Sequence, residues 1–376
     1  MRARIVIIGT GTTGLCLALE LARRTNPLSD PVLLVSAGET APAELELCRY
    51  DLEVEALSLE ARHGLRFWAG LWSATGRDPG WNPCGLTYAE VSTEGPPALK
   101  RMRELGASVH LEGGRVSDED AGTLCTKKAA GSLEALAREA GAIVRKGEIA
   151  EGLVVEGGRV VGVKTSSGMI SAGEVVLAGA SAAALAPDGA PALSEKVWTE
   201  FAYDGEGRDC AEEGASGEEL GLEDLFTTND LKPEAAAAVF ESHFEQESPS
   251  GSEVRAQASG DLVASPEQGG RLWVGGFEQS ESVAEELARR TLGAANLSSR
   301  RSHGLWSTAD ERPIVGPLPS IEGVWIGCAF GEKTSLLAPA CAESLSDLIL
   351  AGESGWFHGG VCDPSRAAVS WSSRAR

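Results

Sequence analysis

The chain has 376 residues, a formal net charge of −22 at pH 7 and an apolar fraction of 43%. Such a negative charge repels phosphates, so we expect no nucleic-acid partner. No apolar run reaches the ~18 residues that cross a bilayer, and the first predicted strand leaves no room for a signal peptide, so we expect a cytoplasmic protein without a membrane segment. Eight scattered cysteines without a C-x-x-C pair favour neither a disulfide framework nor a metal site.

The first predicted elements are a strand, a glycine loop and a helix, within RIVIIGTGTTGLCLALELARR. The β-branched run Ile5–Ile8 is typical of a strand buried on both faces of a parallel sheet. Three glycines follow in the spacing G-x-G-x-x-G, and an apolar helical stripe follows them. This pattern lets a pyrophosphate approach the backbone at a helix N-terminus. We predict a dinucleotide-binding loop, with a purely structural turn as the alternative; the predicted contacts are Gly9, Gly11, Thr12, Thr13 and Gly14.

The second predicted strand, PVLLVSAGE, lacks the acidic residue that normally binds the ribose about 20 residues after the glycine loop. Its last residue is Ser36, and Glu39 follows three residues late. Either Ser36 makes one weaker hydrogen bond to the ribose, or Glu39 folds back towards it. No basic residue favours NADP. These residues predict a dinucleotide without specifying which one.

Further helices and strands alternate up to the middle of the chain. We expect a long helix at 52–72, a strand at 85–91, a helix at 96–107 that begins at a proline pair, and a helix at 131–144 with Ser132 as N-cap and Gly141 at its end. From residue 148, short strands broken by Glu-Gly-Gly and Ser-Ser-Gly predict a three-strand meander.

The second half begins with an acidic stretch, 203–224, which we interpret as a solvated loop rather than an acidic docking surface. We then expect strands within 252–277, a helix at 281–293, a short strand VWIG, an irregular loop and an apolar C-terminal helix. In the tail 352–376, Trp356 and Trp371 look exposed. The tail either packs on a partner or is a frayed end.

The order of elements resembles the FAD-dependent amine oxidoreductase family of D-amino-acid oxidase, glycine oxidase and sarcosine oxidase, to about residue 351. Three blocks carry the resemblance: the N-terminal loop, the meander GGRVVGVKTSSGMISAGEVVLAGASAAAL, and TADERPIVGPLPSIEGVWIG, which is similar to the family's T-x-D-x-x-P-I-x-G-P hallmark. The resemblance implies FAD. No cysteine lies between Cys210 and Cys328, where the sarcosine oxidase subgroup attaches flavin, so we expect non-covalent binding.

The resemblance also implies the architecture. It is an α/β fold with a Rossmann-like, glutathione-reductase-like FAD-binding domain and a second, mostly antiparallel β-sheet substrate domain. The FAD-binding domain would comprise residues 1–75, 125–195 and 298–351. The substrate domain would comprise 76–124 and 196–297, and residues 352–376 would form a C-terminal tail.

Two residues are predicted to be catalytic by this resemblance. AFGEKTS (329–335) is similar to the family's flavin loop, with Lys333 where histidine is common; Lys333 either stabilises the anionic reduced flavin or points to water. Trp306 stands where amino-acid oxidases often place an arginine that clamps the substrate carboxylate, so we expect an apolar or aromatic substrate. Arg49 is either a flavin or pyrophosphate contact or a surface salt bridge. The other predicted cofactor contacts are Ser36, Ile149, Gly179, Gly331 and Thr334.

We therefore expect an FAD-dependent oxidoreductase that oxidises a C–N bond of a small secondary amine or amino-acid derivative, with hydride transfer to flavin N5. The missing ribose acid, the missing arginine and the altered flavin loop favour an alternative, a non-catalytic family member that is a flavin-binding or structural subunit beside a partner subunit. An NAD-dependent dehydrogenase fits less well, since nothing after residue 150 resembles a nicotinamide-using domain.

Overall fold

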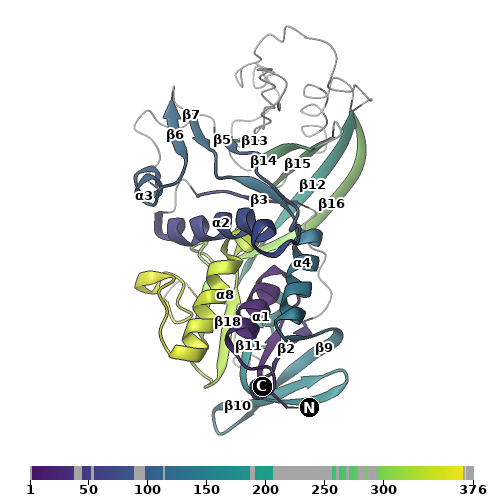
Figure 1. Cartoon of the computed structure of the whole chain (residues 1–376), viewed down its shortest axis with the longest axis vertical. Coiled ribbons are helices and arrows are strands. Elements are labelled where there is room, and N and C mark those ends of the chain that lie inside the picture. Colours follow the sequence, from purple (N-terminus) through teal and green to yellow (C-terminus); the bar gives the residue numbers. More distant parts are fainter. Residues whose placement is uncertain are drawn as a thin grey trace.

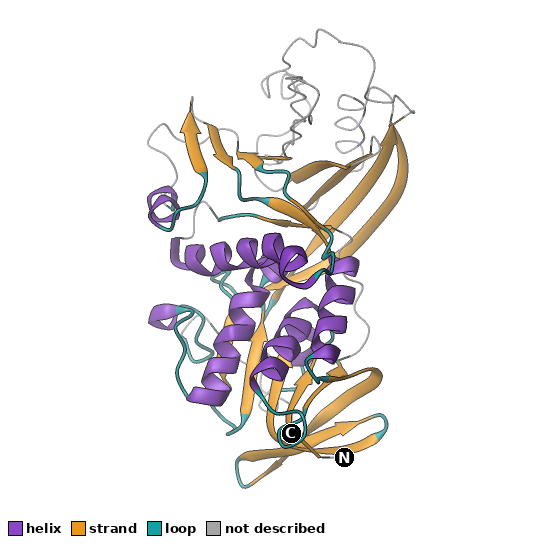
Figure 2. Ribbon diagram, viewed as in Figure 1, coloured by secondary structure: helices purple, strands orange, loops and turns teal. Residues whose placement is uncertain are grey.

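Three sheets and a layer of helices make up the described part of the chain (Figures 1 and 2). The computed structural model describes residues 2–37, 45–51, 55–88, 98–112, 115–186, 191–205, 256–259, 262–267, 271–277, 285, 289, 295–366 and 369. Residues 206–224 of the predicted acidic loop, Glu39, Trp371 and most of the predicted helix 281–293 lie outside these residues. Residues 203–205 of that predicted loop belong instead to a strand, Ser194–Gly205. Within the described residues, no helix is long and apolar enough to cross a membrane.

The seven-stranded sheet has β1 at its centre, parallel to β2 on one side and to β11 on the other. β9 continues the parallel part beyond β2, and β18 continues it beyond β11, while β17 is antiparallel at the edge. β10 pairs antiparallel with β9 and β11, as the predicted meander requires. The strands are β1 (Arg2–Ile8), β2 (Val32–Ser36), β9 (Ile143–Glu156), β10 (Arg159–Thr165), β11 (Gly168–Ala178), β17 (Ile314–Pro317) and β18 (Val324–Cys328).

Both faces of β1 are buried, as its continuous apolar run predicts. Ile5 and Ile7 belong to a core shared with three helices that cover one face of the sheet: α1 (Thr12–Arg24), α4 (Thr126–Glu139) and α8 (Thr334–Ala351). Val6 and Ile8 belong to a second core, with apolar residues of β10, β11 and the short helix α5 (Ala180–Ala183). The centre of the sheet is therefore closed to solvent on both sides, and ligand access at β1 is left at the strand end.

The eight-stranded sheet is antiparallel except where β13 runs parallel to β5. Its order is β16-β12-β15-β14-β13-β5-β7-β6, so the strands predicted in 252–277 lie between β12 and β5. The strands are β5 (Leu86–Tyr88), β6 (Val109–Glu112), β7 (Arg115–Asp118), β12 (Ser194–Gly205), β13 (Ala256–Ser259), β14 (Leu262–Glu267), β15 (Arg271–Phe277) and β16 (Ala295–Ser307).

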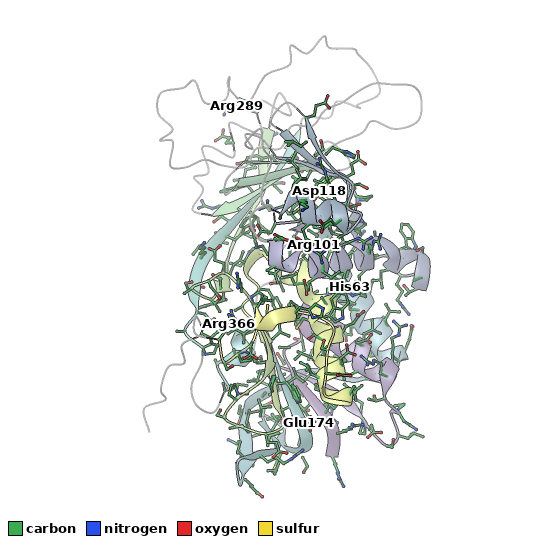
Figure 3. All side chains as sticks on the ribbon, turned by 90° about the vertical axis from the view of Figure 1, so that its left-hand side faces the viewer. His63, Arg101, Asp118, Glu174, Arg289 and Arg366 are labelled. Carbon is green, nitrogen blue, oxygen red and sulfur yellow. The ribbon has the colours of Figure 1, made fainter. Side chains whose placement is uncertain are left out.

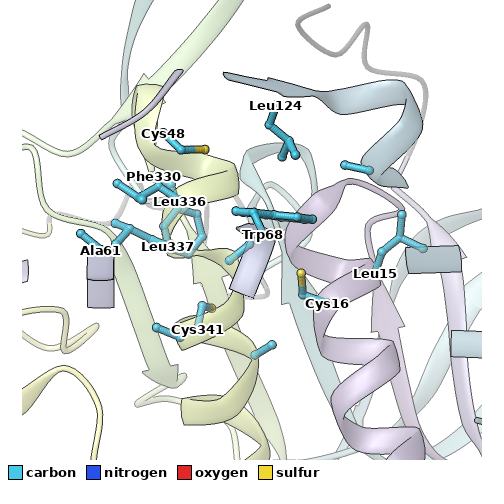
Figure 4. Close-up of a cluster of buried hydrophobic side chains, with 14 of the residues drawn as sticks. Leu15, Cys16, Cys48, Ala61, Trp68, Leu124, Phe330, Leu336, Leu337 and Cys341 are labelled. Carbon is cyan, nitrogen blue, oxygen red and sulfur yellow. The ribbon is translucent and has the colours of Figure 1, made fainter. Parts of the chain in front are cut away.

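A three-stranded sheet and the helix α2 (Ser58–Thr75) lie between the two large sheets (Figure 1). This small sheet consists of β3 (Leu45–Cys48), β8 (Gly122–Cys125) and β4 (Trp81–Asn82). Trp68 of α2 is fully buried, and its Nε1 donates to the Ser335 carbonyl at 2.8 Å. Figure 4 shows Trp68 at the centre of an apolar cluster that contains Cys48, Phe330, Leu336 and Leu15. This cluster fixes the N-terminus of α8 against α2.

Three predicted helices have other boundaries in the structure. The helix predicted at 52–72 is α2, which begins at Ser58 and ends at Thr75. α4 begins at Thr126, and the predicted N-cap Ser132 lies inside the helix, where its hydroxyl donates to the Asp78 carbonyl. The segment 126–130 contains good helix formers, so the helix continues through Gly131, which costs less than a new N-terminus. The predicted helix 96–107 is shorter in the described residues: α3 spans Leu99–Glu104 and ends before Gly106, which has φ +73°.

The predicted frayed end is wrong for residues 353–366, which pack on their own chain; the predicted packing of the tail on a partner stays a prediction. Trp356, expected to be exposed, is half-buried; its Nε1 donates to Glu343 at 3.0 Å, and its ring lies 4.6 Å from that of His63. The Phe357 backbone N–H donates to Glu60 of α2 at 2.8 Å. These partners lie far apart in the sequence, so no sequence pattern could predict their contacts.

Arg366 connects the tail to the TADERP segment (Figure 3). Its Nε and Nη2 donate to the two oxygens of Asp310, both at 3.0 Å, and Nη2 also donates to the Arg312 carbonyl at 2.7 Å. These hydrogen bonds, with one from Thr308, hold the pKa of Asp310 well below its usual range. The hallmark segment is therefore held in place by a residue outside the family-like part of the chain.

We predict that Arg366→Met lowers the free energy of unfolding by about 2–4 kcal/mol, because it removes the cation and its hydrogen bonds from a partly buried carboxylate, which keeps only neutral donors from Thr308 and Arg312. Since the pKa of Asp310 is depressed, this contribution is complete above about pH 4 and is lost as the pH falls below it. Urea unfolding at pH 7 and at pH 3 measures both effects. Arg159→Met, which removes the exposed pairs of Arg159 with Glu174 and Glu322, is the control with an expected loss below about 1 kcal/mol. Equal losses for both variants would contradict the prediction.

Candidate functional site

The glycine loop after β1 leaves open space at one glycine only. A Cβ on Gly9, which has φ +119°, would overlap the Ala178 carbonyl, and a Cβ on Gly14 would overlap the Gly9 carbonyl. These two glycines allow α1 to pack closely against β1 and β11. A Cβ on Gly11 meets no atom of the described residues within 4 Å, so its surface is open to a ligand.

The N-terminus of α1 has the properties of an anion site. Gly11 is its N-cap, no side chain caps it, and its first turn has no acidic residue. Thr13 is 3% exposed, and its Oγ1 has no hydrogen-bond partner among the described residues. An orphaned buried hydroxyl beside free helix N–H groups is satisfied by a ligand that accepts hydrogen bonds. The residues of the loop therefore fit the pyrophosphate of a dinucleotide.

Ser36 ends β2 beside a large bulge of β9. Val35 pairs with Arg145 and Ser36 pairs with Ile149, so residues 146–148 bulge out at this edge. Glu148 in the bulge accepts hydrogen bonds from Arg145 at 2.8 Å and Thr165 at 2.6 Å, which hold its pKa below the usual range. The end of β2, where the expected ribose-binding acidic residue is missing, thus lies beside the Glu148–Arg145 ion pair of the neighbouring strand β9. The Lys-Gly-Glu interruption of an apolar strand was its only sequence signal.

Ile149 and Gly179, the other two predicted cofactor contacts near the end of β2, have different surroundings. Ile149 is 44% exposed, but its backbone N–H donates to the Ser166 hydroxyl and its carbonyl accepts from the Ser166 N–H. Gly179 has φ +92°, and a Cβ there meets nothing within 4 Å in the described part of the chain, so this position leaves open space after β11. The structure thus leaves Gly179 open, as it does Gly11.

The predicted flavin loop lies against the segment that follows β3. The 3₁₀-helix η2 (Gly331–Lys333) precedes α8, and two ion pairs join it to residues 49–51. Lys333 pairs with Asp51, and Arg49 pairs with Glu332 at 3.4 Å. The Lys333 side chain is 18% exposed, so it does not extend into water. The structure therefore brings together Arg49, Gly331, Lys333 and Thr334, and adds two carboxylates that sequence patterns did not reveal.

A third carboxylate from β3 reaches the start of α8. Glu46 accepts hydrogen bonds from the Ser335 backbone N–H and hydroxyl, both at 2.5 Å. Burial raises the pKa of Glu46 to about 7, although the Ser335 hydrogen bonds oppose the shift. Its sequence signal is an acidic residue inside the apolar strand LELC.

The segment 49–51 is anchored from the eight-stranded sheet. Asp118, at the end of β7 and 1% exposed, accepts from the Tyr50 backbone N–H at 3.4 Å, and Asp120 accepts from the Tyr50 hydroxyl at 3.4 Å. Burial raises the pKa of Asp118 to about 7. Arg49 and Asp51, on either side of Tyr50, are thereby fixed opposite η2.

Trp306 lies near η2 along β16. The next residue, Ser307, pairs with Phe330, which precedes η2. Trp306 is 39% exposed and pairs across the strands with Glu195 of β12, whose carboxylate lies over Gly304. This position therefore combines an indole ring with a carboxylate instead of a guanidinium.

A strand–glycine-loop–helix at the centre of a parallel sheet, with an open, uncapped helix N-terminus, defines a dinucleotide-binding enzyme. Comparison with known families makes the assignment specific: the family described as FAD dependent oxidoreductase (DAO) matches residues 4–199, just over half of the chain. The chain belongs to this family, and FAD is its cofactor. No curated protein matches the sequence.

Solved structures agree with this fold. Similar structures include L-proline dehydrogenase from P. horikoshii (TM-score 0.69, 17% identity, covering 96% of this chain and 97% of that one), glycine oxidase from Bacillus cereus ATCC 14579 (0.65, 18%, 100% and 99%) and L-amino acid deaminase from Proteus vulgaris (0.71, 14%, 97% and 97%). At these identities the likeness establishes the fold alone.

Proposed function

We propose that the chain oxidises the C–N bond of a small amine, with a preference for secondary amines or amino-acid derivatives. The observation that carries the proposal is the α1 N-terminus, where Gly11 is open and the Thr13 hydroxyl is buried without a partner among the described residues. Bound FAD would supply the chemistry by accepting a hydride at N5. The named structural neighbours are an oxidase, a dehydrogenase and a deaminase of amino acids, and they support oxidation at a C–N bond; the preference for a substrate without a carboxylate rests on this chain's own residues.

In this proposal the chain's own residues bind and orient. Gly9, Gly11, Thr12, Thr13 and Gly14 hold the pyrophosphate, Ser36 and Gly179 border the adenosine end, and Arg49, Gly331, Lys333 and Thr334 border the flavin end. The seven-stranded sheet with its helices is the Rossmann-like, glutathione-reductase-like FAD-binding domain. The eight-stranded sheet is the substrate domain.

The substrate end favours a molecule without a free carboxylate. Trp306 offers an apolar ring face, and Glu195 beside it repels an anion and attracts an ammonium group. A cation placed over the indole gains about 0.5–2 kcal/mol from the ring quadrupole. An amine with an apolar substituent therefore complements both side chains.

The test is reduction of the FAD-loaded protein by a panel of amines without oxygen, followed as loss of the flavin absorbance. We predict that aromatic or aliphatic secondary amines without a carboxylate reduce it faster than glycine, sarcosine or D-amino acids at millimolar concentration. Trp306→Arg combined with Glu195→Gln should reverse this order, since a guanidinium then faces the substrate. Trp306→Leu, which keeps an apolar surface, is the control and should not favour carboxylates. Fast reduction of the wild-type protein by simple amino acids would contradict this substrate assignment.

A further inference from the structure

The carboxylate of Glu46 occupies the N-terminus of α8. It accepts two hydrogen bonds from Ser335, which is fully buried, and no side chain of η2 or α8 caps this helix. A carboxylate at a helix N-terminus is stabilised by the helix dipole and by the free N–H groups. Glu46 thus uses the α8 position that is best suited to a negative charge from outside the helix.

That position borders the proposed flavin end, because η2 and the start of α8 form the loop 329–335. The Ser335 N–H cannot donate fully to Glu46 and to a cofactor oxygen at once. We propose that Glu46 competes with FAD for the α8 N-terminus, an inference that rests on the proposed function. FAD then binds only when the Glu46 carboxylate leaves Ser335 and takes up a proton.

The surroundings of Glu46 explain why it would take up a proton. The Glu332 carboxylate of η2 acts on Glu46 directly and raises its pKa. The other charged groups of the two neighbouring segments are Lys333 of η2 and Arg49 and Asp51 after β3. Lys333 pairs with Asp51 and Arg49 with Glu332, so each cation already has an anionic partner. A displaced Glu46 carboxylate would lie near these ion pairs in a partly buried site. Burying the protonated, neutral form of Glu46 there costs less free energy than burying its charged form.

The thiol of Cys48 on β3 does not supply a compensating charge. Its pKa lies well above the usual value because of burial and the neighbouring Glu46 carboxylate, so it stays a neutral thiol. Burial of Glu46 already shifts its titration to near neutral pH before any ligand binds. Proton uptake therefore occurs within an accessible pH range.

The experiment titrates the full-length protein with FAD by flavin fluorescence from pH 6 to pH 9. For the wild-type protein we expect an affinity that is nearly constant below pH 7 and falls about tenfold per pH unit above it. Glu46→Gln keeps the side-chain shape without the charge. This variant should bind FAD about 10–100-fold more tightly than wild type at pH 8.5, with little dependence on pH. Glu332→Gln, which changes the neighbouring carboxylate that does not bond Ser335, is the matched control: FAD affinity should still fall with rising pH, with the midpoint moved to lower pH because the Glu332 charge raises the pKa of Glu46.

A second measurement needs only the wild-type protein. Calorimetry of FAD binding at pH 8.5, in buffers of different ionisation enthalpy, should show uptake of about one proton per FAD. Equal and pH-independent affinities for wild type and Glu46→Gln, or no proton uptake, would overturn the role of Glu46 and leave the proposed function standing. Absence of FAD binding to both proteins at every pH would instead remove the proposed function, and this inference with it.

Discussion

Gly11→Val should abolish FAD binding, with a loss of affinity of at least about 100-fold, while the protein stays folded. The valine side chain would extend into the open space beside the α1 N-terminus, where it blocks the approach of the pyrophosphate to the backbone. Gly11 has φ −76°, a conformation that any residue adopts, so the substitution introduces no backbone strain. Flavin fluorescence titration measures the loss, and circular dichroism with thermal unfolding measures the fold.

The matched control lies three residues further along the same loop. In Gly14→Ala even a methyl group would overlap the Gly9 carbonyl, so α1 cannot keep its distance from β1 and the protein itself should lose stability. The two variants therefore separate a ligand-facing glycine from a packing glycine. Normal FAD binding by Gly11→Val would show that the pyrophosphate does not lie at this loop.

The sequence predicted those parts of the fold that are determined by residues close together in the chain. The run Ile5–Ile8, the glycine spacing and the stripe of α1 each lie within about ten residues, and together they predicted a buried strand, a tight turn and a helix. The turns of the meander were equally predictable, because Gly157 and Gly158 adopt positive φ values that other residues disfavour.

The parts that the sequence did not predict depend on contacts between distant residues. Glu46 bonds Ser335 and Lys333 pairs with Asp51, each across more than 280 positions. No periodicity connects such partners, because burial brings them together only after the sheets have formed. Arg366 shows the same limit: the tail looked frayed because its partner, Asp310, lies in another segment.

These pairs change what the lysine of the flavin loop is expected to do. A lone ammonium beside the reduced flavin would stabilise its negative charge, but Lys333 is already paired with Asp51 in a site where both side chains are only about one-fifth exposed. The pair as a whole is neutral, and its effect on the cofactor depends on which charge lies closer to the pyrimidine edge. Removal of either partner takes away the opposite charge that lies beside the other.

Lys333→Met should therefore weaken sulfite binding to the FAD-loaded protein by roughly 2–4 kcal/mol, since the Asp51 carboxylate, without the Lys333 ammonium beside it, then opposes the anionic adduct. Asp51→Asn should act in the opposite direction, because it leaves the Lys333 ammonium without its anion, and the double variant should lie between the two. Lys128→Met, which removes a surface pair with Asp78, is the control and should leave sulfite affinity unchanged. Spectrophotometric titration with sulfite measures all four proteins. If Lys333→Met and Asp51→Asn both keep the wild-type affinity, the pair lies away from the flavin and Lys333 serves only to hold η2 against the segment after β3.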